Sequence, residues 1–336
     1  MAYPSSTASR SASAEPAPAP AAIESTPIPR VATAPWHVTW LTWPVMFVSN
    51  IAAISLTITQ HWTLAVTMAA TTGSFVVVLI TLEFLYPLDS RWRMTLRSFF
   101  GRDIKYFIAG GLTGALTNFV LALAGISLSL GHVGPITHWP VWIAAPTLIV
   151  AFDFLQYWQH RWSHEADTPL KHFLWRTHAP HHLPEQVYVL MHPAGHPFNF
   201  FLLQGLLRLP LFYWLGASPE AIFAASGIIG LQGLVSHCNV DLRAGWFNYV
   251  FMGTELHRYH HSGDASEAKN FATALSLLDV VFGTLIYRPG EAPKQLGVAR
   301  QADYPQSREF WKTMLIPLRR RGYGGPGIHG PATHRS

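Results

Sequence analysis

Long runs of apolar residues, separated by short polar stretches, dominate the chain from residue 41 onward. Four runs are about long enough to cross a hydrocarbon core of ~30 Å as helices, which rise ~1.5 Å per residue. They cover residues 41–59, 64–85, 104–130 and 142–158. We therefore predict an all-α, polytopic integral membrane helical bundle with about four transmembrane helices.

Two shorter apolar runs follow, at residues 198–214 and 221–235. Pro210 interrupts the first, and proline removes a helical hydrogen bond and kinks or ends a helix. We expect these runs to form a hairpin that crosses part of the membrane or enters and leaves by one face. Whether residues 198–235 cross it fully stays open.

The two ends of the chain differ from its middle. Residues 1–35 are rich in Ala, Pro and Ser and contain almost no large apolar residues. Such a segment cannot bury enough surface to offset its ordering entropy, so we expect a disordered tail. Residues 36–290 are expected to form the membrane-embedded domain, and residues 291–336 a cytoplasmic C-terminal tail.

The distribution of Lys and Arg predicts an orientation. The segment between the second and third apolar runs is basic, whereas residues 131–141 contain neither Lys nor Arg. Cytoplasmic loops carry the excess of Lys and Arg in membrane proteins, so we place the basic segment, both termini and residue 160 on the cytoplasmic side. The basic segment carries Arg91, Arg93, Arg97, Arg102 and Lys105.

Composition agrees with a membrane protein. The 336 residues are 49% hydrophobic and only 12% charged, which is too apolar and too poor in charge for an ordinary soluble domain. The formal net charge of +5 is then attributed to the asymmetry of the loops. Basic runs interleaved with stacking aromatic residues are absent from the sequence, so we expect no nucleic-acid partner.

Three groups of histidines lie between residues 160 and 261, one spaced HxxxH and two spaced HxxHH. Imidazole is the commonest side-chain ligand of transition metals. A structural zinc site needs about four ligands, so this larger set indicates two metal ions. The groups are His160 and His164; His178, His181 and His182; and His257, His260 and His261.

The spacing has a geometric meaning if these segments are helical. Residues three or four apart share one face, so His160 and His164 could chelate one ion. The adjacent His181 and His182 diverge by about 100° and could point at different ions. The second HxxHH group repeats this geometry, and we predict that the two act together on a dimetal centre in a helical cytoplasmic cap.

Two other kinds of metal site fit these residues less well. A zinc peptidase is disfavoured, because Thr168 stands where the second His of HExxH is required after His164. Cys238 is the only cysteine, which excludes thiolate zinc and iron–sulfur sites.

Asp153 is an ionisable residue on an apolar run, on the same helical face as His160, and we expect it to orient a metal-bound imidazole. The alternative is an aspartate that packs helices.

The histidine groups and their surroundings resemble the fatty acid hydroxylase/sterol desaturase superfamily of membrane-bound non-haem diiron oxygenases. The resemblance covers roughly residues 80–290. The residues that carry it are DFLQYWQHRWSH at 153–164, LWRTHAPHH at 174–182, His192-Pro193, His237-Cys238-Asn239, ELHRYHHS at 255–262, Asn270-Phe271 and DVVFGT at 279–284.

The resemblance implies two iron ions as cofactors and dioxygen as co-substrate. It also implies a ninth ligand, His237, and places His192, Asn239 and Asn270 close to the centre, where we expect them to support the ligands. Whether Asp241 or His196 adds a ligand stays open.

The activity implied is oxidation of a lipid C–H bond, and we favour hydroxylation of a sterol-like or long-chain lipid. Desaturation by the same kind of enzyme is the first alternative. A non-catalytic membrane protein that binds metal is the second. Because the sequence shows no ferredoxin, flavin or nicotinamide motif, we expect electrons from a separate donor that resembles a ferredoxin or a b-type cytochrome.

Overall fold

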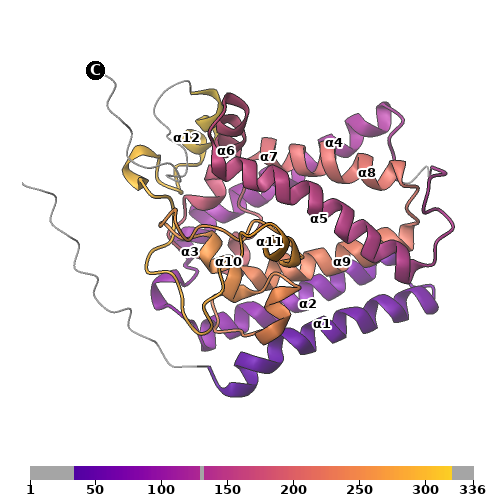
Figure 1. The fold of residues 1–336 in the computed structure, drawn as a ribbon, viewed down its shortest axis with the longest axis horizontal. Helices are drawn as coiled ribbons and strands as arrows, with labels where there is room; N and C mark the ends of the chain where they lie inside the picture. Colours follow the sequence, from indigo (N-terminus) through magenta and orange to yellow (C-terminus); the bar gives the residue numbers. More distant parts are fainter. Residues whose placement is uncertain (1–33, 129–131, 320–336) are drawn as a thin grey trace, which may run out of the picture.

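The computed structural model describes residues 34–128 and 132–319 (Figure 1). Within these ranges the chain is helical and forms no strand beyond one isolated bridge between Ser262 and Leu296. The predicted all-α fold is therefore confirmed.

Among the described residues, five helices are long and apolar enough to cross a membrane. All four predicted runs are among them, and the fifth comes from the shorter pair that followed. Polytopic membrane architecture is thus supported by length and composition. The five are α1 (Trp36–Thr59), α2 (Leu64–Leu85), the stretch Ser90–Leu123 that ends in α4 (Ile104–Leu123), α5 (Val141–Glu165) and α9 (Pro219–Ser236).

Both shorter runs are helical, and the first arm of the pair stays helical through Pro210. This arm consists of α7 (Pro197–Phe201), the π-helical η4 (Leu202–Arg208) and α8 (Leu209–Trp214). Pro210 lies in the first turn of α8, where proline is tolerated, and the wider π turn precedes it. The second arm, α9, begins at Pro219 after Ser218, whose hydroxyl caps it by accepting from the backbone N–H of Ala221.

Helix α9 occupies the middle of the bundle and contacts α1, α2, α5 and α10 (Thr254–His260). Small residues allow this close packing. A Cβ atom at Gly227 would lie only 3.2 Å from the side chain of Ile54 on α1. Two polar contacts fix the same pair of helices: Asn50 donates to the Gly227 carbonyl at 3.0 Å, and the Trp43 indole donates to Gln232 at 3.1 Å.

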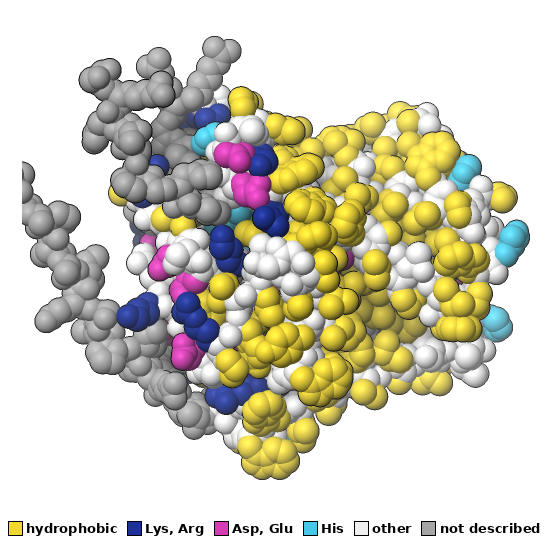
Figure 2. Space-filling model, viewed as in Figure 1, with side chains coloured by type: hydrophobic (Ala, Val, Ile, Leu, Met, Phe, Trp, Pro, Cys, Tyr) yellow, Lys and Arg dark blue, Asp and Glu magenta, His cyan; other side chains and the backbone are white. Residues whose placement is uncertain are grey.

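Most of the short elements gather at one end of the bundle, whereas α7 and α8 run along the bundle toward its other end (Figure 1). The elements there include α3 (Leu96–Ser98), α6 (Pro169–His182), α10, α11 (Leu277–Val281) and α12 (Phe310–Met314). Both ends of the described chain lie on this side, as the predicted topology requires, and which side is cytoplasmic stays a prediction. Figure 2 shows charged side chains gathered at this end and a broad apolar surface over the rest, as expected for a membrane belt.

The described part of the predicted C-terminal segment packs on this end of the molecule. Phe310 and Ile316 are buried in two of its apolar clusters, and Tyr106 on α4 lies 2.7 Å from Thr313, hydroxyl to hydroxyl. Most of the N-terminal segment 1–35 and residues 320–336 lie outside the described ranges. The proposed domain boundaries at residues 36 and 290 stay predictions.

Candidate metal centre

The first two histidines come from the last turns of α5. His160 and His164 are buried on one face of this helix, as their spacing predicted. Arg161 and Glu165 form an i,i+4 ion pair at 2.9 Å on its outer side, and the helix ends at Glu165, directly before Ala166, which adopts a left-handed conformation with φ 44°.

Helices α6 and α10 carry the two HxxHH groups. Helix α6 begins at Pro169, and the Thr168 side chain caps it by accepting from the backbone N–H of Lys171. Its C-terminal half carries the first HxxHH group. Helix α10 carries His257 and His260, and His261 directly follows it.

All nine histidines predicted as ligands converge into two groups, within each of which the candidate ligand atoms lie within 4.8 Å of one another. As the spacing predicted, the adjacent His181 and His182 enter different groups, and so do His260 and His261. Each HxxHH segment gives two side chains to one group and one to the other. The five-histidine group contains His160, His164, His178, His182 and His260, and the four-histidine group contains His181, His237, His257 and His261.

The ring nitrogens within each group are very close. In the five-histidine group, the Nε2 atom of His178 lies 2.9 Å from those of His160 and His182. In the four-histidine group, the Nε2 atom of His257 lies 3.0 Å from that of His237 and 3.2 Å from that of His261. The two groups adjoin, since the ring centroids of His182 and His261 are 4.6 Å apart.

Backbone carbonyls orient four of the rings. The Nδ1 atoms of His160, His181, His237 and His260 lie 2.7 to 2.9 Å from carbonyl oxygens of Phe271, Ala194, Gly233 and Lys269 respectively. A carbonyl oxygen only accepts hydrogen bonds, so each Nδ1 carries the hydrogen. In a neutral imidazole Nε2 then presents a lone pair toward the other histidines, as a metal ligand must.

Two of these lone pairs face each other. The Nε2 atoms of His181 and His237 are 3.2 Å apart, although both rings carry their hydrogen on Nδ1. Burial lowers the pKa of His181 to about 4 and that of His237 far below the usual range, so both rings are neutral at pH 7. Two facing lone pairs repel, and a cation between them converts this repulsion into coordination.

Other buried ring nitrogens have no hydrogen-bond partner among the described residues. Both ring nitrogens of His164 and the Nε2 atom of His260 belong to this class. A buried polar atom left unsatisfied costs about 1–3 kcal/mol. Metal coordination would satisfy these atoms, and an all-imidazole donor set suits iron and other transition metals. The residues present therefore fit a pair of metal ions.

Asn270 supports the centre by fixing the backbone on both sides of its own position in the chain. Its side chain donates to the carbonyls of Leu256 at 2.8 Å and Ile286 at 2.9 Å, and its φ of 59° turns the chain sharply. The carbonyls of its two neighbours, Lys269 and Phe271, hold His260 and His160. Asn270 thus holds in place the two residues whose carbonyls orient His260 and His160.

Asp153 does not contact a histidine in the described structure. Its carboxylate accepts hydrogen bonds from the backbone N–H groups of Thr273, Ala274 and Leu275. Seven residues correspond to ~10.5 Å along a helix, so a shared face with His160 does not bring the two side chains into reach. The expectation that Asp153 orients an imidazole directly is replaced by a role in holding the segment that follows Phe271.

Asp279, which received no separate role from the sequence, holds the same segment. Its carboxylate accepts from the backbone N–H of Phe271 at 2.7 Å and of Ala272 at 3.1 Å, and from the Thr284 hydroxyl at 2.6 Å. Burial raises its pKa to about 6. The motif DVVFGT contains both side chains, but the motif alone does not show which backbone groups they bind.

Two predicted neighbours of the centre behave differently. His192 lies against the four-histidine group, with its Nδ1 atom 3.3 Å from Nδ1 of His237, but it belongs to neither group. Asn239 instead exchanges hydrogen bonds with the backbone of Asp89, and its own N–H donates to the Glu83 carboxylate. It therefore ties the loop after α9 to the end of α2.

The structure also resolves two open questions and adds a residue. His196 caps α7 and Asp241 pairs with Arg243, and neither is part of a histidine group. Asn199 on α7 was not expected near the centre, yet its amide nitrogen lies 3.3 Å from Nδ1 of His178. Its amide oxygen is buried without a partner, and a flipped amide would let that oxygen accept from this ring. A single Asn within an aromatic stretch gives little signal in the sequence.

Comparison with known proteins agrees with this geometry. Residues 145–284, which include all nine histidines, match the family model for fatty acid hydroxylase. This part of the chain is thus similar to a fatty acid hydroxylase domain. The resemblance seen in the sequence is thereby confirmed.

Three relatives are similar over different shares of their length. Ornithine lipid hydroxylase OlsE of Rhizobium tropici is 28% identical over 259 residues, 74% of this chain and 75% of that protein. Very-long-chain aldehyde decarbonylase GL1-4 of Oryza sativa is 24% identical over 44% of this chain and 25% of that protein. Fatty acid hydroxylase vlmA of Lecanicillium is 24% identical over 48% of each chain. No solved structure matches the chain.

Together these findings support a multi-pass membrane protein that oxidises lipids at a histidine-rich site able to hold metal.

Proposed function

We propose that the protein is a diiron, dioxygen-dependent hydroxylase of a long-chain lipid. The observation that carries this proposal is the pair of adjoining histidine groups, whose lone pairs converge from α5, α6, α10 and the end of α9. Nine neutral imidazoles without a thiolate suit two redox-active ions better than a closed structural zinc site.

The reaction balances with two external electrons. One C–H bond and one dioxygen molecule, with two electrons and two protons, give one C–OH group and one water molecule. Bound iron would supply the oxygen chemistry. The chain itself keeps the imidazoles neutral by burial, aims Nε2 of His160, His181, His237 and His260 by carbonyl contacts, and excludes water from the buried site.

An apolar groove of about 570 Å³ fits a lipid chain. It lies on the outer side of α5 and α6, and Gln159 is its only polar lining residue. Gln159 precedes His160, and Leu174 in the groove is one helical turn before His178. An acyl chain in this groove would lie directly behind the helices that carry the five-histidine group. The apolar lining is Leu155, Trp158, Trp162, Leu170, Leu174 and Leu207.

The Rhizobium tropici relative, which matches 74% of this chain, favours an amphiphile with acyl chains over a sterol, because it is described as an ornithine lipid hydroxylase. Desaturation is the alternative within the same chemistry, and it removes two hydrogen atoms from the lipid without adding oxygen. A metal-binding membrane protein without catalysis is the second alternative, and it predicts neither product.

The test is lipid analysis with isotopically labelled dioxygen. Cells that express the protein, and cells that express the His178→Ala variant, are grown with iron and labelled dioxygen, and their lipids are compared by mass spectrometry. We expect lipids that gain one labelled oxygen atom only with the unaltered protein. The control variant His196→Ala should keep activity, because this residue caps α7 outside the histidine groups.

The other outcomes separate the alternatives. Lipids that lose two hydrogen atoms without gaining label would favour the desaturase. Identical lipids in both cultures, from protein that holds zinc after purification, would favour the non-catalytic protein and contradict the proposal.

A further inference from the structure

A second groove, polar and basic, lies at the end of the molecule that carries the loops. Its volume is about 810 Å³, and three segments line it: residues 91–102, 183–186 and 294–308. The lining contains one carboxylate, that of Glu185, and five cationic side chains: Arg91, Arg97, Arg102, Lys294 and Arg308.

Two of these cations are already neutralised. Arg91 pairs with Asp89 at 2.5 Å, and Arg102 pairs with Asp103 at 2.7 Å. In contrast, the other three cations are exposed and form no ion pair with any carboxylate in the described chain. They are Arg97, Lys294 and Arg308. Three of the five cations that line the groove therefore have no carboxylate at ion-pair distance in the described chain.

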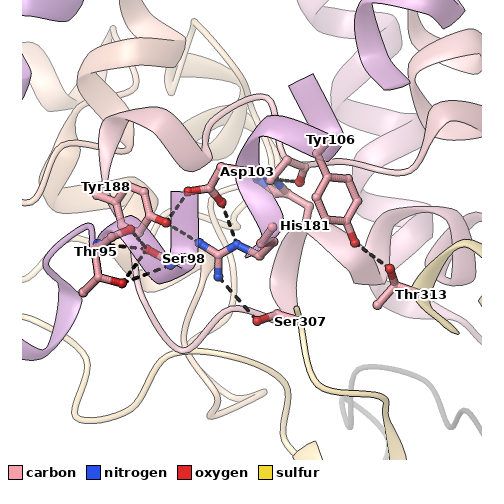
Figure 3. Close-up of polar contacts among 10 residues, drawn as sticks. Thr95, Ser98, Asp103, Tyr106, His181, Tyr188, Ser307 and Thr313 are labelled. Atoms are coloured by element: carbon pink, nitrogen blue, oxygen red, sulfur yellow. Dashed lines mark hydrogen bonds and ion pairs between the residues drawn. The ribbon is translucent and has the colours of Figure 1, made fainter. Parts of the chain in front are cut away.

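Internal contacts hold the walls of this groove together (Figure 3). The buried guanidinium of Arg102 donates to Asp103, to the Tyr188 hydroxyl at 2.5 Å and to the Ser307 hydroxyl at 3.4 Å. Tyr188 in turn donates to Asp103 at 2.5 Å. These bonds join the segment before α4 to the loop after α6 and to the C-terminal segment. A groove built in this way exists before a partner arrives, so little ordering entropy opposes binding.

The inner wall of the groove is the backbone that carries the metal centre. Leu183 directly follows His182, which belongs to the five-histidine group, and Glu185 is two residues further along the chain. Leu296 forms the isolated bridge with Ser262, and the N–H of the next residue, Gly297, donates to the His261 carbonyl at 3.0 Å. His261 belongs to the four-histidine group. One or two residues of backbone thus separate the groove from a histidine of each group.

We propose that this groove is the docking site of an acidic protein that donates electrons one at a time, such as a ferredoxin. The inference rests on the proposed function, whose reaction consumes two external electrons per dioxygen. Each electron would leave a reduced iron–sulfur cluster of the donor, and the wall beside His182 and His261 would separate that cluster from the iron that the two histidine groups would hold. Unbalanced positive charge on a preformed surface attracts and orients an acidic protein. The three unpaired cations are exposed and spread over separate segments, which suits a broad protein surface better than a small anion.

Binding to a defined probe tests the docking site. The iron-loaded protein is placed in nanodiscs of uncharged lipid, and its affinity for an acidic plant-type ferredoxin is measured at low and high salt. We expect each of Arg97→Glu, Lys294→Glu and Arg308→Glu to weaken binding by about tenfold at low salt, and salt to reduce this difference. Arg93→Glu is the matched control, because Arg93 is exposed on the same loop but does not line the groove. Its effect should be much smaller.

A second measurement separates docking from catalysis. A small chemical reductant replaces ferredoxin, and lipid oxidation should then proceed equally in the three variants and the unaltered protein. Equal ferredoxin affinity in all proteins, or no binding by the unaltered protein, would overturn the docking site. If the variants keep their ferredoxin affinity but lose affinity for inorganic phosphate or phosphatidylglycerol vesicles, the groove binds an anion or a lipid headgroup and the assignment is likewise wrong. Failure of the unaltered protein to oxidise lipid with the chemical reductant would count against the proposed function instead.

Discussion

The Nδ1 atom of His160 lies 2.7 Å from the carbonyl oxygen of Phe271, a residue that is held from both sides. The N–H of Phe271 donates to Asp279, and the preceding Asn270 is tied to Leu256 and Ile286. The orientation of a candidate ligand therefore depends on a carboxylate that touches no histidine. Partners of this outer kind typically change metal affinity or activity by about 10–100-fold.

Asp279→Asn should weaken metal binding at the five-histidine group. Asparagine keeps one acceptor oxygen but presents an NH₂ group to a backbone N–H, so one of the bonds to Phe271 and Ala272 is lost. Because the neighbouring carbonyls orient His160 and His260, we expect about tenfold weaker binding of one metal ion and little change for the other. Metal content measured during titration with a chelator checks this.

Asp264→Asn is the matched control for that variant. Asp264 is exposed, and its carboxylate accepts only from Ser266. Its substitution should leave the chelator titration unchanged. If Asp279→Asn loses both ions together, or neither, the connection through Phe271 is contradicted.

Asp153→Asn should act on stability more than on metal affinity. The carboxylate is the shared acceptor of three backbone N–H groups at residues 273–275, beyond the carbonyls that hold the ligands. Loss of its charge should lower the free energy of unfolding by about 1–3 kcal/mol. Thermal melting and metal content of the same detergent-solubilised preparation separate the two effects. Weakened metal binding at an unchanged melting temperature would contradict this and would indicate that Asp153 acts directly on a metal-binding histidine.

The membrane helices were predictable because bilayer thickness fixes the length of an apolar run. The boundaries of α9 were harder to predict from the sequence. Its first turn carries Pro219 and Glu220, and its last residue is Ser236, so the apolar run at 221–235 understates an 18-residue helix. Polar residues in the terminal turns satisfy the helix ends, and simple hydropathy counts them as loop.

The division of the histidines between two groups was also predictable, because it depends only on the angle between neighbours on one helix. Contacts between distant segments were not. Phe271 is 111 residues from His160, and the sequence gives no reason why its carbonyl should meet that ring. Asn199 and Asp279 were missed for the same reason. For Asp153 the shared helical face was correct, but the rise along the axis places it too far from His160.

The topology predicts opposite labelling of the two ends of the bundle. Single cysteines replace Ser90, Arg300, His61 or His138, which are all exposed. The native Cys238 is buried, so it should react little with a membrane-impermeant maleimide. In inside-out vesicles, we expect the reagent to label positions 90 and 300 and to spare 61 and 138, with the reverse pattern in intact cells. Labelling of positions 90 and 300 in intact cells would contradict the cytoplasmic placement of the metal centre.

Removal of one histidine from either group should release one metal ion and keep the other. His164→Ala affects only the five-histidine group, and His257→Ala only the four-histidine group. Both residues have buried ring nitrogens without hydrogen-bond partners in the described chain, so alanine breaks no hydrogen bond at those atoms and the apoprotein should still fold. We expect each variant to retain about one ion per chain, and His196→Ala to retain two. X-ray absorption distinguishes the retained ions: the one left by His257→Ala keeps the five-imidazole environment, and the one left by His164→Ala keeps the four-imidazole environment. If either variant loses both ions while still folded, the groups do not bind metal independently.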